Sequence, residues 1–281
     1  MKLSCHNLTR KFGDTTALNG VNLCLDEPKI YGLLGRNGAG KTTLLRLITN
    51  YIQPTEGSIT LDEQNVWENE KAQHQIFLVT ETSYFAEMNA HKLIQLMSEI
   101  YPSFDKQQCL DYAKRFELDL NKKYTALSTG YKSVLRAVLS LSVHTPFLFL
   151  DEPTLGMDAF HRELFYKLLI ESYSESPSCI LLSTHLISEV EGLLENVIIL
   201  DHGKVLIDES SEQLLAQVVE RALQVAERDA LVHHQALDLR ELGQVGGVGH
   251  VAAVHLAGRD DEDGQLVVLH RVHLHARGLR A

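Results

Sequence analysis

A glycine-rich stretch at residues 35–42, GRNGAGKT, fits the pattern G-x-x-x-x-G-K-[ST] of a loop that wraps phosphates. It follows the strand-like run KIYGLL and opens the helical run TTLLRLI, so backbone N–H groups and the positive end of a helix would face one phosphate chain. Lys41 is predicted to reach the β- and γ-phosphates and Thr42 to ligate Mg²⁺. The predicted phosphate-binding residues are Gly35, Asn37, Gly38, Ala39, Gly40, Lys41, Thr42 and Thr43.

A second stretch, PFLFLDEP at residues 146–153, places two carboxylates at the end of an apolar run typical of a buried parallel strand. Ligands of open α/β sheets bind at such strand ends. Asp151 is predicted to support Mg²⁺, and Glu152 to polarise the attacking water as a general base. His185, in CILLSTHLISEVE, follows another buried run and is predicted to contact the γ-phosphate edge or to orient water. Taken singly, these residues would also fit an acidic turn and a loop histidine.

The stretch LSTGYKS at residues 127–133 also has the chemistry of a phosphate cradle. Ser128, Thr129 and Gly130 supply hydroxyls, backbone N–H groups and a flexible turn at the head of an apolar helical run from Tyr131 to Val143. The N-terminal amides of that helix form an anion site. The plain alternative is an ordinary N-cap turn, in which a Ser or Thr side chain caps the helix.

The predicted elements alternate between strands and helices, which favours an α/β core with a mainly parallel sheet. Short strand-like runs with glycine turns fill most of the first ninety residues, and one helical run from Lys41 to Ile52 interrupts them. The pattern is helical from about residue 87 to 127, which predicts a helical insertion. Further on, helices are predicted at 131–143, 158–173 and 186–194, and strands at 147–150, 179–183, 197–200 and 204–207.

The composition is that of an acidic globular protein. A net charge of -11 argues against a nucleic-acid surface, because backbone phosphates are bound by clustered Lys and Arg. Cys5, Cys24, Cys109 and Cys179 are far apart, so neither a disulfide framework nor a zinc site is predicted, and a reducing compartment is expected. No signal peptide is predicted, and the apolar runs fall short of the roughly 20 residues that span a bilayer. Any membrane role is therefore expected to come through a partner.

The last seventy residues differ in kind. From Glu212 to Ala281 the chain uses only Glu, Gln, Leu, Ala, Val, Arg, Asp, His and Gly, types that make up roughly half of average usage. All nine have codons that begin with G or C. We therefore predict that most of this tail is translated out of its evolved frame in a GC-rich gene; the alternative is a real, biased, weakly structured appendage. Five histidines of the tail are not expected to form a metal site: His233, His234, His270, His273 and His275.

Taken together and in order, the motifs resemble those of the ATP-binding subunit of an ABC transporter, over about Lys2 to Leu215. The resemblance implies an α/β P-loop NTPase with a RecA-like mainly parallel sheet core, an N-terminal antiparallel β subdomain and an inserted α-helical subdomain at about 82–126. It implies a nucleotide-binding domain at 1–217, followed by the biased tail at 218–281. ATP and Mg²⁺ are the implied cofactors.

The resemblance also gives LSTGYKS a role. It looks like the family's LSGGQ signature, which closes over the ATP held by the other protomer, so Ser128 and Gly130 would meet a γ-phosphate in trans. Thr129 and Tyr131 replace the usual Gly and Gln. The implied partners are a second nucleotide-binding domain, in a homo- or heterodimer, and a separate transmembrane permease. The chain would then lie in the cytoplasm, peripheral on the inner face of the cell membrane.

Three further residues correspond to family positions. Phe12 matches the aromatic that stacks on adenine, commonly Tyr, although it would also fit a core Phe at a strand end. Asp158 matches the loop by which protomers sense each other, or simply caps the next helix. Glu81 stands where the family usually has Gln after a strand. Its carboxylate would approach Mg²⁺, but the change puts coupling to the permease in doubt.

The leading prediction is a transporter ATPase, and its sequence looks more like export-type subunits of drug, antimicrobial-peptide or antibiotic-stress systems than like nutrient importers. The main alternative is a soluble ABC ATPase that acts on ribosomes or DNA; one phosphate loop, no sustained heptads and an acidic balance count against it. A small-molecule kinase or GTPase would share the phosphate loop but not the signature, and the chain lacks a guanine-binding N-K-x-D motif.

Overall fold

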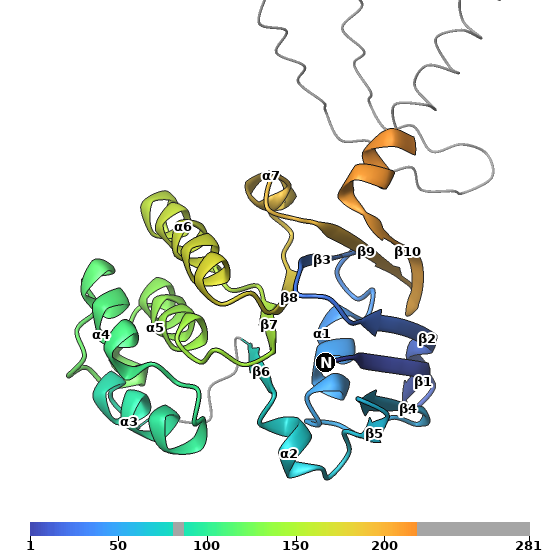
Figure 1. Ribbon diagram of the computed structural model, residues 1–281, viewed down its shortest axis with the longest axis horizontal. Coiled ribbons are helices and arrows are strands. Elements are labelled where there is room, and N and C mark those ends of the chain that lie inside the picture. The colour runs from blue at the N-terminus through green and yellow to red at the C-terminus, as the bar shows by residue number, and fades with distance from the viewer. Residues whose placement is uncertain (81–86, 218–281) are drawn as a thin grey trace, which may run out of the picture. The chain divides into compact units, whose positions relative to one another are not determined.

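Two β-sheets organise residues 1–80 and 87–217, the part of the chain that the computed structural model describes (Figure 1). The first sheet is antiparallel, with the order β2-β1-β4-β5. Its strands are β1 (Leu3–Phe12), β2 (Thr15–Leu25), β4 (Glu56–Leu61) and β5 (Gln64–Asn65). β1 and β2 are longer than the predicted runs, because a two-residue turn lets Phe12 pair directly with Thr15.

The second sheet has the order β10-β9-β3-β8-β7-β6 and is parallel except at its edge strand β10. Because its strands run parallel, the C-terminal ends of β3, β8 and β7 meet at one edge of the sheet. The prediction of an α/β fold with a mainly parallel core and an antiparallel N-terminal sheet is confirmed. The strands are β3 (Ile30–Leu34), β6 (Ile76–Val79), β7 (Phe147–Asp151), β8 (Cys179–Ser183), β9 (Asn196–Asp201) and β10 (Lys204–Ser210).

The helices of the described residues largely follow the predicted periodicity. They are α1 (Lys41–Ile48), α2 (Glu70–Gln73), α3 (Ala90–Ile100), α4 (Lys106–Arg115), α5 (Thr129–Leu141), α6 (Ala159–Glu175) and α7 (Ile187–Val190), with a 3-10 turn at Tyr124–Ala126. α1 ends four residues before the predicted Ile52, because Asn50 takes a left-handed conformation with φ 63°. α7 is shorter than predicted, since the chain must turn into β9.

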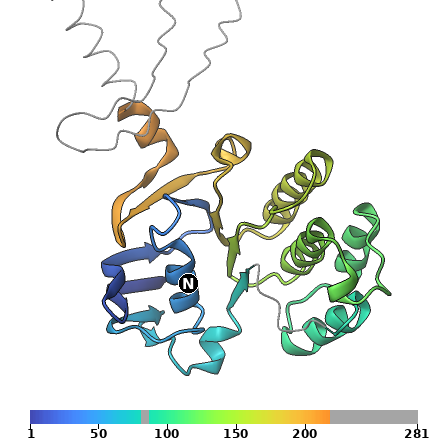
Figure 2. The same ribbon diagram turned by 180° about the vertical axis from the view of Figure 1, so that it is seen from behind.

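Alternate residues of β7 face two cores on opposite sides of the second sheet. Phe147 and Phe149 pack with residues of α1 and the antiparallel sheet, whereas Leu148 and Leu150 pack with residues of α5 and α6. All four are buried. Both views show α1 on one side of this sheet and α5 and α6 on the other (Figure 1 and Figure 2). The buried run therefore fixes Asp151 at the end of a strand that is covered on both faces.

The cysteines are free, as predicted. Burial raises the pKa of Cys5, Cys109 and Cys179 to about 12, which keeps them as unreactive thiols.

Two features of the sequence lie outside the described residues: Glu81 and the tail 218–281. The domain boundaries and the frameshift origin of the tail stay predictions. Within the described ranges, no helix has the length and apolar character needed to cross a bilayer.

Candidate functional site

The loop between β3 and α1 contains close backbone approaches that only glycine allows. At Gly35, with φ 152°, an added Cβ would lie 2.2 Å from the carbonyl oxygen of Leu200. At Gly40, with φ 110°, it would lie 2.7 Å from the carbonyl oxygen of Ala17. The sequence pattern thus corresponds to a tight loop whose backbone is free to approach a ligand. Of the other predicted loop residues, Ala39 is buried, Thr43 is partly buried, and Asn37 and Gly38 are exposed.

Lys41 lies over this loop. Its Nζ donates hydrogen bonds to the carbonyl oxygens of Gly35, at 2.6 Å, and Arg36, at 3.2 Å. Gly40 is the N-cap of α1, and no side chain caps this helix, so its first N–H groups are available to an anion. The loop therefore combines a cation with open backbone donors, which is the chemistry of a phosphate site.

The phosphate loop and the acidic end of β7 are joined directly. Thr42 Oγ1 donates a hydrogen bond of 2.7 Å to Asp151 Oδ2, across 109 residues of sequence. Two oxygen ligands of the kind that Mg²⁺ prefers thus lie side by side next to Lys41. The structure brings these three predicted residues together.

Glu152 and His185 form a second pair at the same sheet edge. His185 Nδ1 lies 2.8 Å from Glu152 Oε2, and the side chain of His185 is 59% exposed. Glu152 has φ 47°, a backbone conformation that residues other than glycine rarely adopt and that is often found at functional sites. Its N–H donates to the Ser183 carbonyl at 2.9 Å, which ties the turn after β7 to the end of β8. A carboxylate with a histidine at hydrogen-bond distance suits proton transfer.

Ser128 is the N-cap of α5, and its Oγ accepts a hydrogen bond of 3.3 Å from the Tyr131 N–H. The plain alternative, a capping serine, is therefore present in the structure. Ser128 is also exposed, as a group that meets a second chain must be. Among the described contacts, no hydrogen bond or ion pair joins Ser128 or Gly130 to residues 35–42.

Asp158 is the N-cap of α6, which is the plainer of the two roles predicted for it. Its Oδ1 accepts from the His161 N–H at 2.9 Å, and its Oδ2 lies 2.9 Å from His161 Nδ1. The backbone N–H of His161 lowers the pKa of the Asp158 carboxyl, and the His161 side chain adds to the effect. His161 also stacks on Phe116 and meets the edge of Tyr131, with ring centroids 5.9 and 5.6 Å apart. No motif in the sequence pointed to His161.

Phe12 ends β1 with 47% of its surface exposed, so it is not the core residue of the plain alternative. The guanidinium carbon of Arg10 lies 4.5 Å from its ring centroid. An exposed aromatic ring can stack on a flat ligand such as a base.

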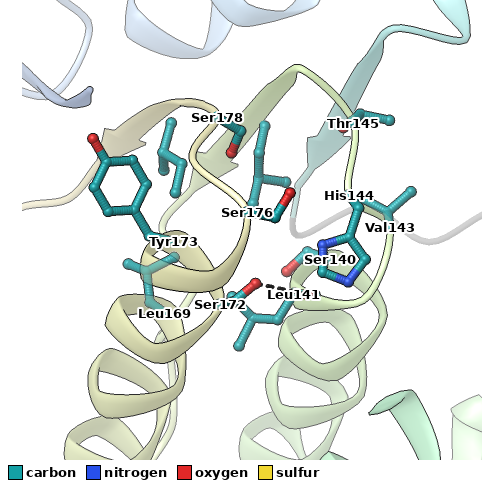
Figure 3. A pocket seen from close by; sticks show the side chains of 12 residues that line it. Ser140, Leu141, Val143, His144, Thr145, Leu169, Ser172, Tyr173, Ser176 and Ser178 are labelled. Carbon is teal, nitrogen blue, oxygen red and sulfur yellow. Dashed lines mark hydrogen bonds between the residues drawn. The ribbon is translucent and has the colours of Figure 1, made fainter. Parts of the chain in front are cut away.

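A small pocket lies between the C-terminal ends of α5 and α6 (Figure 3). It is lined by Ser140, His144, Thr145, Tyr173 and others, and Ser172 Oγ donates to the Leu141 carbonyl at 3.1 Å. Thr145 and Ser178 precede β7 and β8, so the pocket lies at the strand ends opposite to Asp151. None of the predicted site residues lines it.

Comparison with known proteins identifies the family. A profile of the ABC transporter family matches residues 18–155. The ABC transporter ATP-binding protein YtrB of Bacillus subtilis (strain 168) is 32% identical over 196 residues, which cover 69% of this chain and 67% of YtrB. The chain belongs to the ABC transporter ATP-binding family. This ABC protein is also similar to the lantibiotic transport ATP-binding protein SrtF of Streptococcus pyogenes, at 30% identity over 73% of this chain and 90% of SrtF. The bacitracin transport ATP-binding protein BcrA of Enterococcus faecalis is 28% identical over 72% and 67%.

Solved structures show the same fold for the ABC protein. An ATP-binding subunit of an ABC transporter matches with a TM-score of 0.70 and 23% identity, over 78% of this chain and 93% of that one. A dimeric post-hydrolysis cassette bound to ADP and Pi matches with a TM-score of 0.63 and 23% identity, over 74% and 98%. These structures bear on the fold. The family profile and the curated relatives confirm the predicted ATP-binding ATPase subunit of a transporter, and nothing in these similarities favours the ribosomal, DNA, kinase or GTPase alternatives.

Proposed function

We propose that the ABC protein hydrolyses Mg²⁺-ATP in a head-to-tail dimer and so drives export of a peptide antibiotic through a separate permease, at the inner face of the cell membrane. The hydrogen bond between Thr42 and Asp151 carries the hydrolytic part of the proposal, because it unites the phosphate loop with the acidic strand end. The export part is supported by the lantibiotic and bacitracin transport proteins among the relatives.

In this proposal Thr42 and Asp151 hold Mg²⁺ together with the phosphates. The donor set fits, since Mg²⁺ binds through one or two carboxylates, substrate phosphates and water rather than through a cage of side chains. The ion would neutralise charge on the β- and γ-phosphates. Glu81 is proposed to approach the same ion.

Glu152 is proposed to accept the proton of the attacking water, and His185 to contact the γ-phosphate edge or to orient that water. The 2.8 Å contact between them supports these roles, and the exposure of His185 leaves it free to meet a ligand. Ser128 and Gly130 of a second copy would then cover the γ-phosphate, with Asp158 near the same dimer face. The exposure of Ser128 is consistent with this arrangement.

Phe12 is proposed to stack on adenine, which gives a first prediction. Replacing Phe12 with Ala should raise the dissociation constant for ATP about 5- to 150-fold, because stacking of a base on an aromatic side chain contributes about 1–3 kcal/mol. Binding of a fluorescent ATP analogue measures this change. Phe12→Tyr is the matched control and should bind ATP like the wild type. Equal affinity in Phe12→Ala and wild type would show that Phe12 does not contact the base.

The export proposal predicts antibiotic sensitivity. Deleting the gene in its host should lower the minimal inhibitory concentration of bacitracin or of a lantibiotic several-fold, because the permease would lose its ATPase. Complementation with the wild-type gene should restore resistance, whereas Lys41→Ala, which removes the phosphate-facing ammonium, should not. Unchanged inhibitory concentrations for both antibiotics would contradict export of these peptides while leaving the ATPase assignment intact.

A further inference from the structure

A continuous chain of hydrogen bonds crosses α5. Arg136 Nη1 donates to the carbonyl oxygen of Thr80 at 2.8 Å, and its Nη2 donates to Ser133 Oγ at 2.6 Å. Ser133 Oγ in turn donates to the carbonyl oxygen of Leu155 at 2.6 Å. Two side chains on one helix therefore connect the end of β6 with the loop between β7 and α6.

The chain is built into the interior. Ser133 has no exposed surface and Arg136 is partly buried. Residues three apart lie on the same face of a helix, so Arg136 and Ser133 can share one hydrogen bond. Instead of bonding back to its own helix, the Ser133 hydroxyl reaches a carbonyl 22 residues away. The bonds donated by the Arg136 guanidinium are charge-assisted, and such a bond is stronger in a water-poor setting than on the surface.

The loop at Leu155–Met157 is also held elsewhere. An added Cβ at Gly130 would lie 2.6 Å from the Gly156 carbonyl oxygen, so the turn that begins α5 packs directly on this loop. Arg162 of α6 donates to the Met157 carbonyl at 3.3 Å and pairs with Glu189 of α7 at 3.1 Å. The loop is thus held by α5 and by Arg162 of α6, which is itself paired with α7.

These contacts link the segments that carry the site. Thr80 directly precedes Glu81, the Leu155–Met157 loop lies between Glu152 and Asp158, and Ser128 is the N-cap of α5. A displacement at the end of β6 would therefore move the guanidinium of Arg136 and, through Ser133, the backbone at Leu155, whose N–H donates to the Glu152 carbonyl at 3.2 Å. Reaction rates are sensitive to such shifts, since a misplacement of about 1 Å can cost about 100-fold.

We propose that Arg136, acting through Ser133, is a positioning residue for ATP hydrolysis. It holds the end of β6, the Leu155–Met157 loop and the start of α5 in fixed positions relative to one another. Arg136 does not touch the nucleotide in this proposal. The inference rests on the proposed roles of Glu152 and Ser128, because it supplies the means by which their segments stay aligned.

The test measures kcat, KM and ATP binding of the full chain with Arg136→Met, Arg136→Lys and Ser133→Ala. Arg136→Met should lower kcat about 10- to 100-fold while the KM for ATP changes less than about threefold, because geometry rather than binding is lost. Arg136→Lys keeps the charge and one donor nitrogen in place of two, and it should recover part of the loss. Ser133→Ala should lower kcat too, and combining it with Arg136→Met should add little, as expected for two residues in one chain of bonds.

Arg115→Met is the matched control, because Arg115 makes an exposed ion pair with Glu171 between α4 and α6. It should keep the wild-type kcat. The melting temperature and the ATP-binding fraction of each variant separate positioning from unfolding: a kcat that falls only in proportion to the folded fraction would overturn the inference. So would wild-type turnover in Arg136→Met, or full additivity with Ser133→Ala. Normal hydrolysis by Glu152→Gln would instead overturn the proposed base and leave the Arg136 results to be judged separately.

Discussion

Replacing Glu152 with Gln should stop turnover while ATP remains bound. The amide has the size of the carboxylate but cannot accept the proton of the attacking water, so kcat should fall at least about 100-fold. Because Lys41, Thr42 and Asp151 are unchanged, ATP should still bind, and the chain should accumulate as an ATP-bound dimer. Steady-state phosphate release measures the first effect, and size-exclusion chromatography with and without ATP measures the second.

Glu163→Gln is the matched control for this experiment. Glu163 is an exposed residue of α6, so the same change of charge there should leave turnover and dimerisation at wild-type levels. If Glu152→Gln hydrolyses ATP normally, Glu152 is not the base. A variant that loses ATP binding as well would indicate that the 2.8 Å contact with His185 supports the fold of the site rather than its chemistry.

The parts of the site that could be predicted from sequence are those set by local backbone chemistry. Positions 35 and 40 need glycine, because the neighbouring backbone leaves no room for a Cβ at Gly35 or Gly40. The buried run before Asp151 fixes a strand, and its end is where ligands of a parallel sheet bind. Thr42 was expected near Mg²⁺ because of its place in the phosphate-loop pattern, and Asp151 because it ends a buried parallel strand.

What could not be predicted depends on packing between distant elements. The run from Tyr131 to Val143 predicts an apolar helix, but it does not indicate which carbonyl Arg136 reaches, because that is set by how α5 lies against β6. His161 lies between Asp158 and Phe116 for a similar reason. The early end of α1 before the left-handed Asn50 could not be predicted either, because periodicity alone does not locate the last turn of a helix.

The proposed trans role of Ser128 gives the prediction that most directly tests the dimer. Ser128→Arg should leave ATP binding by the monomer intact, because no described bond joins Ser128 to residues 35–42. Turnover should fall at least about 100-fold, since a long side chain would fill the space that the partner's γ-phosphate must occupy and remove a donor that faces it. Loss of the N-cap itself costs only about 1 kcal/mol, which a melting curve will register separately.

Two comparisons make this result specific. Ser174→Arg places the same side chain at an exposed position near the end of α6 and should hydrolyse ATP normally. Mixing Ser128→Arg with Lys41→Ala combines two inactive chains, yet a mixed dimer pairs an intact Lys41 with an intact Ser128 at one of its two sites. At random pairing this should restore up to about one quarter of wild-type turnover, because half of the dimers are mixed and each has one complete site. Wild-type turnover by Ser128→Arg alone would mean that the signature does not act across a dimer.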